Sequence, residues 1–319
     1  SVLGLRVVPV AGGWPHPVAA DRAALGEVLA ALPDAAAVLV DGLVACGVPE
    51  VVVPHARRLR LGVLVHLPLP DETGLEPAVA ATLARGERET LAAARVVLAT
   101  SRAAARDLTT RYGLPDVRVV PPGVDRAPAT RGSRAGCRLV CVASITPRKG
   151  QDVLVDALAR VAELQWDLRC AGPEPDGPFA ATLRARIELN GLAHRVHLVG
   201  AMTGARLHAC YDSADLVVLP SYAETYGMVV TEALAHGVPV LVSDVGGVQE
   251  ALGAGLSAGV LVPPGDVGAL AGELRRWLTE PSWRARLRSA ALARRGRLTT
   301  WEDAAVPLAA ALRDLEQSP

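Results

Sequence analysis

The stretch that decides the fold is Ser221-Tyr-Ala-Glu224-Thr-Tyr-Gly227-Met-Val-Val-Thr-Glu232-Ala-Leu-Ala-His-Gly-Val-Pro239. It follows a short apolar run, residues 216–219, which is typical of a buried parallel strand. From Gly227 onward the apolar spacing becomes helical. A strand that enters a helix through a short loop leaves backbone N–H groups free at the helix start, and such groups bind phosphate. The stretch therefore predicts a strand–loop–helix unit with a phosphate site at the helix start.

Two carboxylates flank this predicted helix start. Glu224 precedes it, and Glu232 lies eight residues later, inside the helix. Eight helical steps rise about 12 Å at ~1.5 Å per residue, which is roughly the reach of a nucleotide diphosphate-sugar. One carboxylate could accept hydrogen bonds from sugar hydroxyls and the other from the ribose diol. The alternative is an ordinary βα unit with two solvent-facing glutamates.

The composition narrows the class of protein. The chain has 319 residues, half of them apolar, and a formal net charge of zero. This length predicts about two domains, and the neutral charge with few aromatic residues argues against a nucleic-acid partner. The five cysteines form no CxxC pair, so we expect no disulfide framework, no metal site and a reducing compartment. We expect a cytoplasmic location, with peripheral association with a membrane left open. No apolar run reaches the ~18 residues of a transmembrane segment, and no signal peptide is visible.

Strand-like and helix-like runs alternate along the whole chain, which predicts an α/β fold with parallel sheets. We expect a first domain at residues 1–126, a second at 127–300 and a final helix at 301–319. The predicted strands cover residues 6–10, 37–41, 62–66, 95–100, 117–120, 138–143, 167–171, 196–199, 216–219, 239–243 and 258–262. The predicted helices cover 19–32, 76–94, 101–111, 151–163, 179–190, 206–213, a segment starting at Asp266, one after Pro281, and 302–315.

Several short motifs occur in the order found in one large enzyme family. They are residues 100–102 (Thr-Ser-Arg), 120–125 (Val-Pro-Pro-Gly-Val-Asp), 142–151 (Val-Ala-Ser-Ile-Thr-Pro-Arg-Lys-Gly-Gln), 171–173, 211–215, 246–250 and 262–266. Together with the Glu-x7-Glu spacing, the chain resembles the retaining glycosyltransferases of the GT-B fold, family four (glycosyl transferases group 1). The resemblance implies two Rossmann-like domains whose parallel sheets face each other across a cleft, and a final helix that crosses back to the first domain. It also implies a metal-independent glycosyltransferase without a cofactor, which takes a nucleotide diphosphate-sugar donor and a sugar, lipid or small-molecule acceptor.

The resemblance also assigns roles to single residues. It makes Glu224, His66 and Lys149 the catalytic residues: Lys149, the only lysine in the chain, would face the diphosphate, and the other two would contact the donor sugar. Glu232 would hold the ribose, and the base would bind near residues 199–202. The donor-binding set is Ser144, Arg148, Lys149, Val199, Met202, Glu224, Thr225, Tyr226, Gly227, Met228 and Glu232.

Two departures from the family pattern stand out. Ser144 occupies a position where the family usually has an arginine, and Arg148 either supplies the missing charge or is a solvated loop cation. No glycine-rich loop and long helix follow the first predicted strand, so we expect the chain to begin inside its first domain and to leave an exposed apolar edge at residues 6–10. These departures keep an alternative open, namely a donor-binding GT-B protein with little or no transferase activity. An epimerase or phosphorylase would need a further acid pair or a cofactor lysine.

Overall fold

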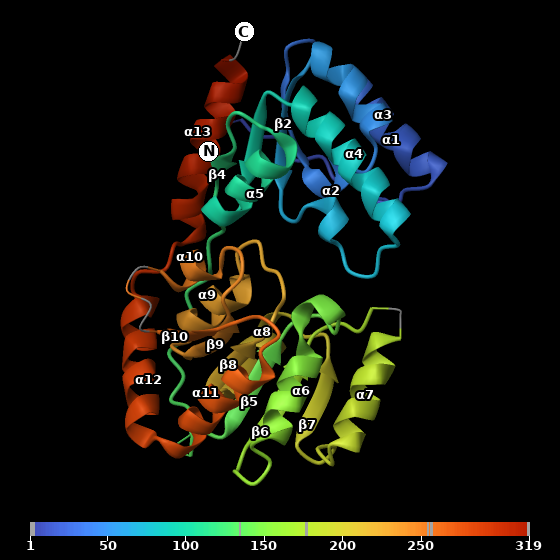
Figure 1. Cartoon of the computed structure of the whole chain (residues 1–319). Coiled ribbons are helices and arrows are strands. Elements are labelled where there is room, and N and C mark those ends of the chain that lie inside the picture. The colour runs from blue at the N-terminus through green and yellow to red at the C-terminus, as the bar shows by residue number, and fades with distance from the viewer. Residues whose placement is uncertain (1–3, 134, 176–177, 254, 256–257, 318–319) are drawn as a thin grey trace. The chain divides into compact units, whose positions relative to one another are not determined.

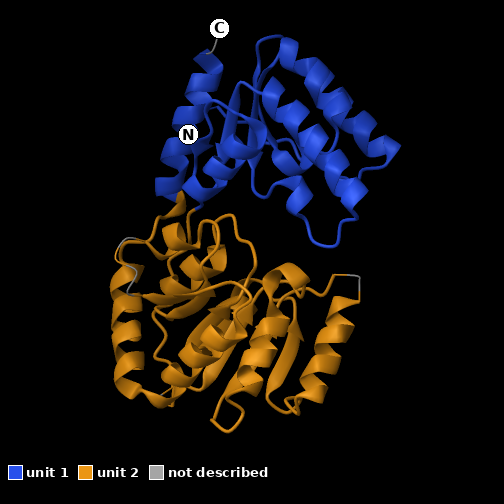
Figure 2. Ribbon diagram, viewed as in Figure 1, with its two compact units in different colours: residues 1–122, 302–319 blue, residues 123–301 orange. Residues whose placement is uncertain are grey.

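The computed structural model describes residues 4–133, 135–175, 178–253, 255 and 258–317. The chain forms two compact units, shown in different colours in Figure 2. Unit 1 comprises residues 1–122 and 302–319, and unit 2 comprises residues 123–301. The last helix therefore belongs to unit 1. The chain first passes from unit 1 to unit 2 after residue 122, whereas the predicted domain boundary follows residue 126.

Unit 1 is built on a four-stranded parallel sheet with the order β1-β2-β3-β4 (Figure 1). Helical segments follow β1, β2 and β3, as the alternation of patterns in the sequence predicts, whereas β4 leads into unit 2. The strands are β1 (Ala37–Asp41), β2 (Arg60–Val65), β3 (Val96–Ala99) and β4 (Arg118–Val119). The helices are α1 (Ala19–Ala30), α2 (Gly42–Ala45), α3 (Pro49–Val52), α4 (Pro77–Ala93), α5 (Arg102–Tyr112) and α13 (Trp301–Gln317), with 3₁₀ turns η1 (Val53–Arg57) and η2 (Leu69–Asp71).

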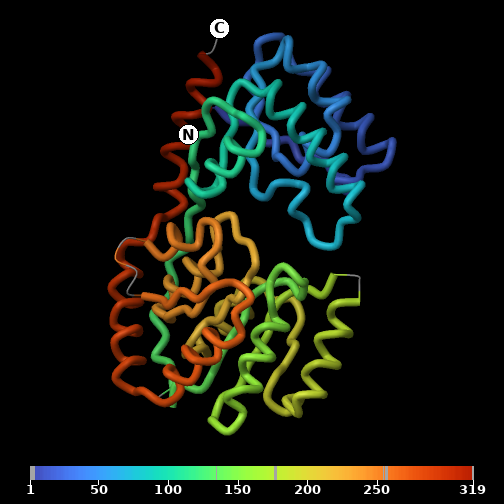
Figure 3. Tube along the Cα trace, viewed as in Figure 1, coloured from blue at the N-terminus to red at the C-terminus, as the bar shows by residue number. Residues whose placement is uncertain are grey.

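Alternate side chains of β3 pack into two separate apolar cores. Val96 and Leu98 pack with Ala311 and Leu315 of α13, whereas Val97 and Ala99 join the larger core beneath the other helices. This follows from the two-residue period of a strand, which points successive side chains to opposite faces. The C-terminal helix thus covers one face of the sheet, and the Cα trace in Figure 3 follows it there in red.

The predicted strand at residues 6–10 is not present. This segment has no regular secondary structure and pairs with no neighbour, and among the described residues β1 pairs only with β2. The sequence prediction was wrong because an apolar run becomes a strand only when another strand offers it backbone hydrogen bonds. The segment instead lies beside β1, α1 and α13, where it borders an apolar cavity of about 620 Å³.

Unit 2 contains a six-stranded parallel sheet with the order β10-β9-β8-β5-β6-β7 around one large core. The predicted strands of this unit are confirmed, β6 and β8 with the expected ends and the others within one residue. The strands are β5 (Arg138–Val142), β6 (Asp167–Ala171), β7 (Val196–Gly200), β8 (Leu216–Leu219), β9 (Val240–Ser243) and β10 (Gly259–Val262). The helices are α6 (Gln151–Ala159), α7 (Phe179–Leu189), α8 (Gly204–Ser213), α9 (Met228–Ala235), α10 (Val248–Leu252), α11 (Val267–Thr279) and α12 (Pro281–Arg295), with a 3₁₀ turn η3 (Pro147–Lys149).

The order of these six strands creates one topological switch point. The chain adds β6 and β7 on one side of β5 and then returns to place β8 on its other side. The loops that follow β5 and β8 therefore leave adjacent strands in opposite directions, and ligands of open α/β sheets bind in the crevice between such loops. Within the described part of the chain, no helix combines the length and the apolar character needed to cross a bilayer.

Candidate functional site

The loop after β5 and the loop after β8 touch at the switch point of unit 2. Gly150 has a φ of +67° between η3 and α6, and a Cβ atom there would overlap the carbonyl oxygen of Pro220. Only glycine combines this left-handed backbone with so close an approach. Two further hydrogen bonds tie the loops together: Tyr222 N donates to Arg148 O at 2.8 Å, and Arg148 Nη1 donates to Ala223 O at 3.1 Å. The predicted Arg148 is therefore a cross-link between the loops and not a solvated cation.

The predicted catalytic pair Lys149 and Glu224 meets where these loops touch. Lys149 Nζ lies 2.6 Å from Glu224 Oε1, and the two side chains are only 15% and 9% exposed. Ser221 Oγ donates a second hydrogen bond to the same oxygen at 2.7 Å. The ion pair is thus mostly withdrawn from water, where removal of one partner leaves an uncompensated charge.

The start of α9 presents unoccupied backbone donors beside this pair. Gly227, the N-cap, has a φ of +89°, and no side chain caps the helix. First-turn N–H groups without a cap are available to an anion, which the helix dipole also favours. The backbone oxygen of Glu224 accepts from Gly247 N at 3.2 Å, so the segment before the helix is held from a third loop. Thr225 lies within this segment. Tyr226 is buried, which raises the pKa of its hydroxyl, and Met228 is partly exposed.

Buried polar atoms without partners cluster on the β5 side. Gln151 is fully buried and donates its Nε2 to Ser144 O at 2.9 Å, but its Oε1 has no partner among the described residues. The same holds for Thr146 Oγ1 and Arg148 Nε. Buried polar atoms normally find hydrogen bonds, so these three atoms are available to water or to a bound ligand.

Glu232 lies farther along α9. Its Oε2 accepts a hydrogen bond of 2.5 Å from the hydroxyl of Tyr211 on α8. Glu232 and Met228 help to line a cavity of about 250 Å³ within unit 2. The predicted base-binding residues Val199 and Met202 pack against the core of the unit and are not among the lining residues of this cavity.

His66 belongs to unit 1, whereas the other predicted site residues belong to unit 2. It follows the end of β2, and its Nε2 lies 3.4 Å from Asp41 Oδ2 at the end of the adjacent β1. The hydrogen bond that His66 donates to Asp41 raises the pKa of His66, and the same bond lowers the pKa of Asp41. The contact between His66 and Asp41 was not predicted, although both residues end parallel strands and so had to meet at one edge of the sheet.

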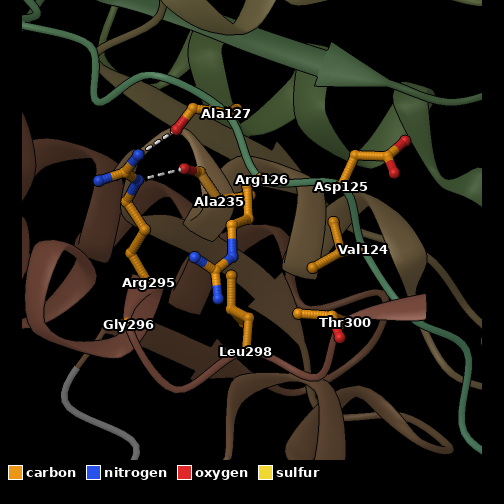
Figure 4. A pocket seen from close by; sticks show the side chains of 9 residues that line it. All are labelled: Val124, Asp125, Arg126, Ala127, Ala235, Arg295, Gly296, Leu298 and Thr300. Carbon is orange, nitrogen blue, oxygen red and sulfur yellow. Dashed lines mark hydrogen bonds between the residues drawn. The ribbon is translucent and has the colours of Figure 1, made fainter. Parts of the chain in front are cut away.

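A second cavity of about 190 Å³ in unit 2 shares the lining residues Val124, Asp125, Ala127 and Ala235 with the cavity at Glu232 (Figure 4). Arg295 holds its wall together, since Nε donates to Ala235 O at 2.7 Å and Nη2 donates to Ala127 O. Arg126 extends towards Leu298 in the same view. No predicted donor-binding residue is among the described residues that line this cavity.

Both units match known sequence families. The family model described as Glycosyltransferase Family 4 matches residues 6–127, and the model described as Glycosyl transferases group 1 matches residues 137–294. The D-inositol 3-phosphate glycosyltransferase of Nocardiopsis dassonvillei is 36% identical over 68% of this chain and 55% of its own length. D-inositol 3-phosphate glycosyltransferase 1 of Catenulispora acidiphila is 32% identical over 77% of this chain and 62% of its own length. The chain thus spans less than two thirds of these relatives.

Solved structures agree on the fold. Sucrose-phosphate synthase from Thermosynechococcus elongatus superimposes with a TM-score of 0.78 at 24% identity, over 93% of this chain and 79% of that one. Anabaena Alr3699/HepE, in complex with UDP and glucose, gives a TM-score of 0.74 at 22% identity, over 91% of this chain and 81% of that one. With two parallel Rossmann-like sheets and a glycosyltransferase match over each, the chain belongs to the family-four (glycosyl transferases group 1) glycosyltransferases of the GT-B fold.

Proposed function

We propose that this chain transfers a sugar from a nucleotide diphosphate-sugar to an acceptor hydroxyl with retention of configuration. The observation that carries the proposal is the Lys149–Glu224 pair beside the uncapped start of α9. A cation, a carboxylate and free backbone donors converge at the switch point of a parallel sheet, where ligands of such sheets bind.

Each of these groups has a place in the proposed reaction. The bond between the anomeric carbon and the phosphate oxygen breaks, and a bond from that carbon to the acceptor oxygen forms on the same face. Lys149 and the first-turn amides of α9 stabilise the negative charge that grows on the leaving diphosphate. Glu224 Oε1 is engaged by Lys149 and Ser221, so Oε2 is left to accept hydrogen bonds from sugar hydroxyls. The departing phosphate oxygen takes the acceptor proton, and the reaction needs neither a metal nor a cofactor.

The names of the relatives indicate which compounds to test first. The two relatives described above are named for D-inositol 3-phosphate, which makes that compound the first acceptor to offer. UDP occupies the related fold of HepE, so UDP-sugars are the first donors. A panel of UDP-, GDP- and ADP-sugars covers the remaining bases.

The test is turnover with analysis of the product. The protein is incubated with each donor and D-inositol 3-phosphate, the product is detected by mass spectrometry, and its anomeric configuration is read from proton NMR coupling constants. We expect product with the anomeric configuration of the donor. Its rate of formation should be strongly reduced in Glu224→Gln and kept in Glu163→Gln, which changes an exposed glutamate paired with Arg275. A product of inverted configuration would contradict the retaining mechanism.

The replacement of the family arginine by Ser144 supports one rival, a protein that binds donor without transferring it. A donor present at 100 times its dissociation constant stabilises a protein by ~2.7 kcal/mol, which a thermal-shift assay detects. Stabilisation by a donor without product from any acceptor would favour this rival.

A further inference from the structure

Tyr211 is buried and held by its neighbours at its contact with Glu232. The side chain is 2% exposed, and its ring stacks on His236 with 5.2 Å between centroids and an interplanar angle of 26°. His236 is itself fixed, since Nδ1 lies 2.8 Å from Asp212 Oδ1 and Nε2 lies 3.2 Å from His208 Nδ1. The tyrosine hydroxyl therefore has one well-defined direction, towards the carboxylate of Glu232.

The contact engages only one oxygen of that carboxylate. Tyr211 donates to Oε2 at 2.5 Å, and among the described residues Oε1 has no hydrogen-bond partner. Burial, and after it the charge of Glu232, raises the pKa of Tyr211 well above its ordinary value, so the hydroxyl remains a donor. A charge-assisted hydrogen bond of this kind is among the stronger ones in proteins and fixes the rotation of the carboxylate.

We propose that Tyr211 is a positioning residue that orients Glu232 so that its free Oε1 accepts from the vicinal diol of a ribose. This inference rests on the proposed function, because it assumes that the ligand of unit 2 is a nucleotide. It makes the Tyr211–Glu232 pair the element that selects ribonucleotide over deoxyribonucleotide donors. The hydroxyl acts through the carboxylate and does not touch the ligand.

The test compares a ribonucleotide with its analogue that lacks the diol. Of UDP, GDP and ADP, the one that raises the melting temperature of the wild type most is titrated calorimetrically, together with its 2′,3′-dideoxy analogue. We expect the wild type to prefer the ribonucleotide by ~10–100-fold, since hydrogen bonds to a charged group are lost in the analogue. Tyr211→Phe should reduce this preference by roughly tenfold and leave binding of the dideoxy compound unchanged.

Unit 1 offers a matched control. Tyr112 also donates to a buried glutamate, Glu87, at 2.5 Å. Tyr112→Phe removes the same kind of bond and should leave the ribose preference intact. Glu232→Gln should remove most of the preference, and adding Tyr211→Phe to it should change little more, because both substitutions act on one contact.

The outcomes separate the inference from the function on which it rests. If Tyr211→Phe weakens binding of both compounds equally, the tyrosine has only a structural role and the inference is overturned. The same holds if the variant keeps the wild-type preference. If the wild type binds none of the three nucleotides, the proposed function fails and the inference fails with it.

Discussion

Replacing each partner of the Lys149–Glu224 ion pair, singly and together, should show strong coupling between the two side chains. The variants are Lys149→Met, Glu224→Gln and the double variant. Each single change leaves the other group without its 2.6 Å partner, at sites only 15% and 9% exposed. Loss of a charged hydrogen bond costs ~1.5–3 kcal/mol, and removal of one member of a fully buried pair costs ~3–5 kcal/mol. Because Lys149 keeps some contact with water, we expect about 2–3 kcal/mol for each single variant.

The double variant should be about as stable as either single one. Once one partner is gone, removing the second takes away an unpaired buried group, so the coupling energy should be about 2 kcal/mol. Urea unfolding followed by tryptophan fluorescence measures this cycle, since four of the five tryptophans (Trp166, Trp277, Trp283 and Trp301) lie in unit 2.

A surface pair of the same length is the matched control for burial. Arg275 Nη1 lies 2.5 Å from Glu163 Oε1, but the two side chains are 47% and 59% exposed. Exposed pairs of this kind contribute little, so the cycle of Arg275→Met and Glu163→Gln should be additive. Additive effects in the Lys149–Glu224 cycle as well would refute the argument that burial makes this pair special.

Three further predictions address the site. Glu224→Gln should lower kcat by ~10–100-fold and leave UDP affinity nearly unchanged, because Glu224 is proposed to bind the donor sugar and not the nucleotide. Loss of UDP binding with normal turnover at saturation would contradict that role. Gly150→Ala should lower the free energy of unfolding in urea by ~2–5 kcal/mol, because the backbone is left-handed and the new Cβ overlaps a facing carbonyl oxygen. Gly191→Ala, at the same φ of +67° but in open space, should lower it by only ~1–2 kcal/mol. Equal losses in the two variants would contradict the overlap argument. An NMR titration should give His66 a pKa above its ordinary value, and Asp41→Asn should lower that pKa. Because the pKa is raised in the folded state, the stabilisation is full below pH ~6.5 and is lost as pH rises through the folded-state pKa. An unchanged His66 pKa in the variant would exclude the pair.

The sequence predicted most of unit 2 because its strands are short, apolar and bounded by loops. Lys149 and Glu224 were both expected at the site, but their direct contact was not. They lie 75 residues apart, and their contact depends on β8 returning to the side of β5, which no local pattern encodes. Ser221, three residues before Glu224, was a signal that could have been used, since a serine at that spacing can reach back to a carboxylate.

Other features depend on tertiary structure in the same way. Tyr211 belongs to the motif at residues 211–215, which was identified only by its place in the order of the family's motifs. Its contact with Glu232 requires α8 and α9 to be neighbours. The apolar run at residues 6–10 has the composition of a strand but pairs with no strand of the sheet. Asp41 was not among the predicted site residues, although the parallel sheet brings it to His66. Composition sets which segments are buried, whereas strand order decides which side chains meet.

The most direct test of the central claim is a crystal structure of this chain with UDP bound. The account predicts the diphosphate at the start of α9, with its oxygens ~3 Å from Lys149 Nζ and from the amides of Gly227 and Met228, and the ribose diol at Glu232. A diphosphate bound elsewhere, such as in the cavity bordered by Arg126 and Arg295, with the Lys149–Glu224 pair untouched, would contradict it.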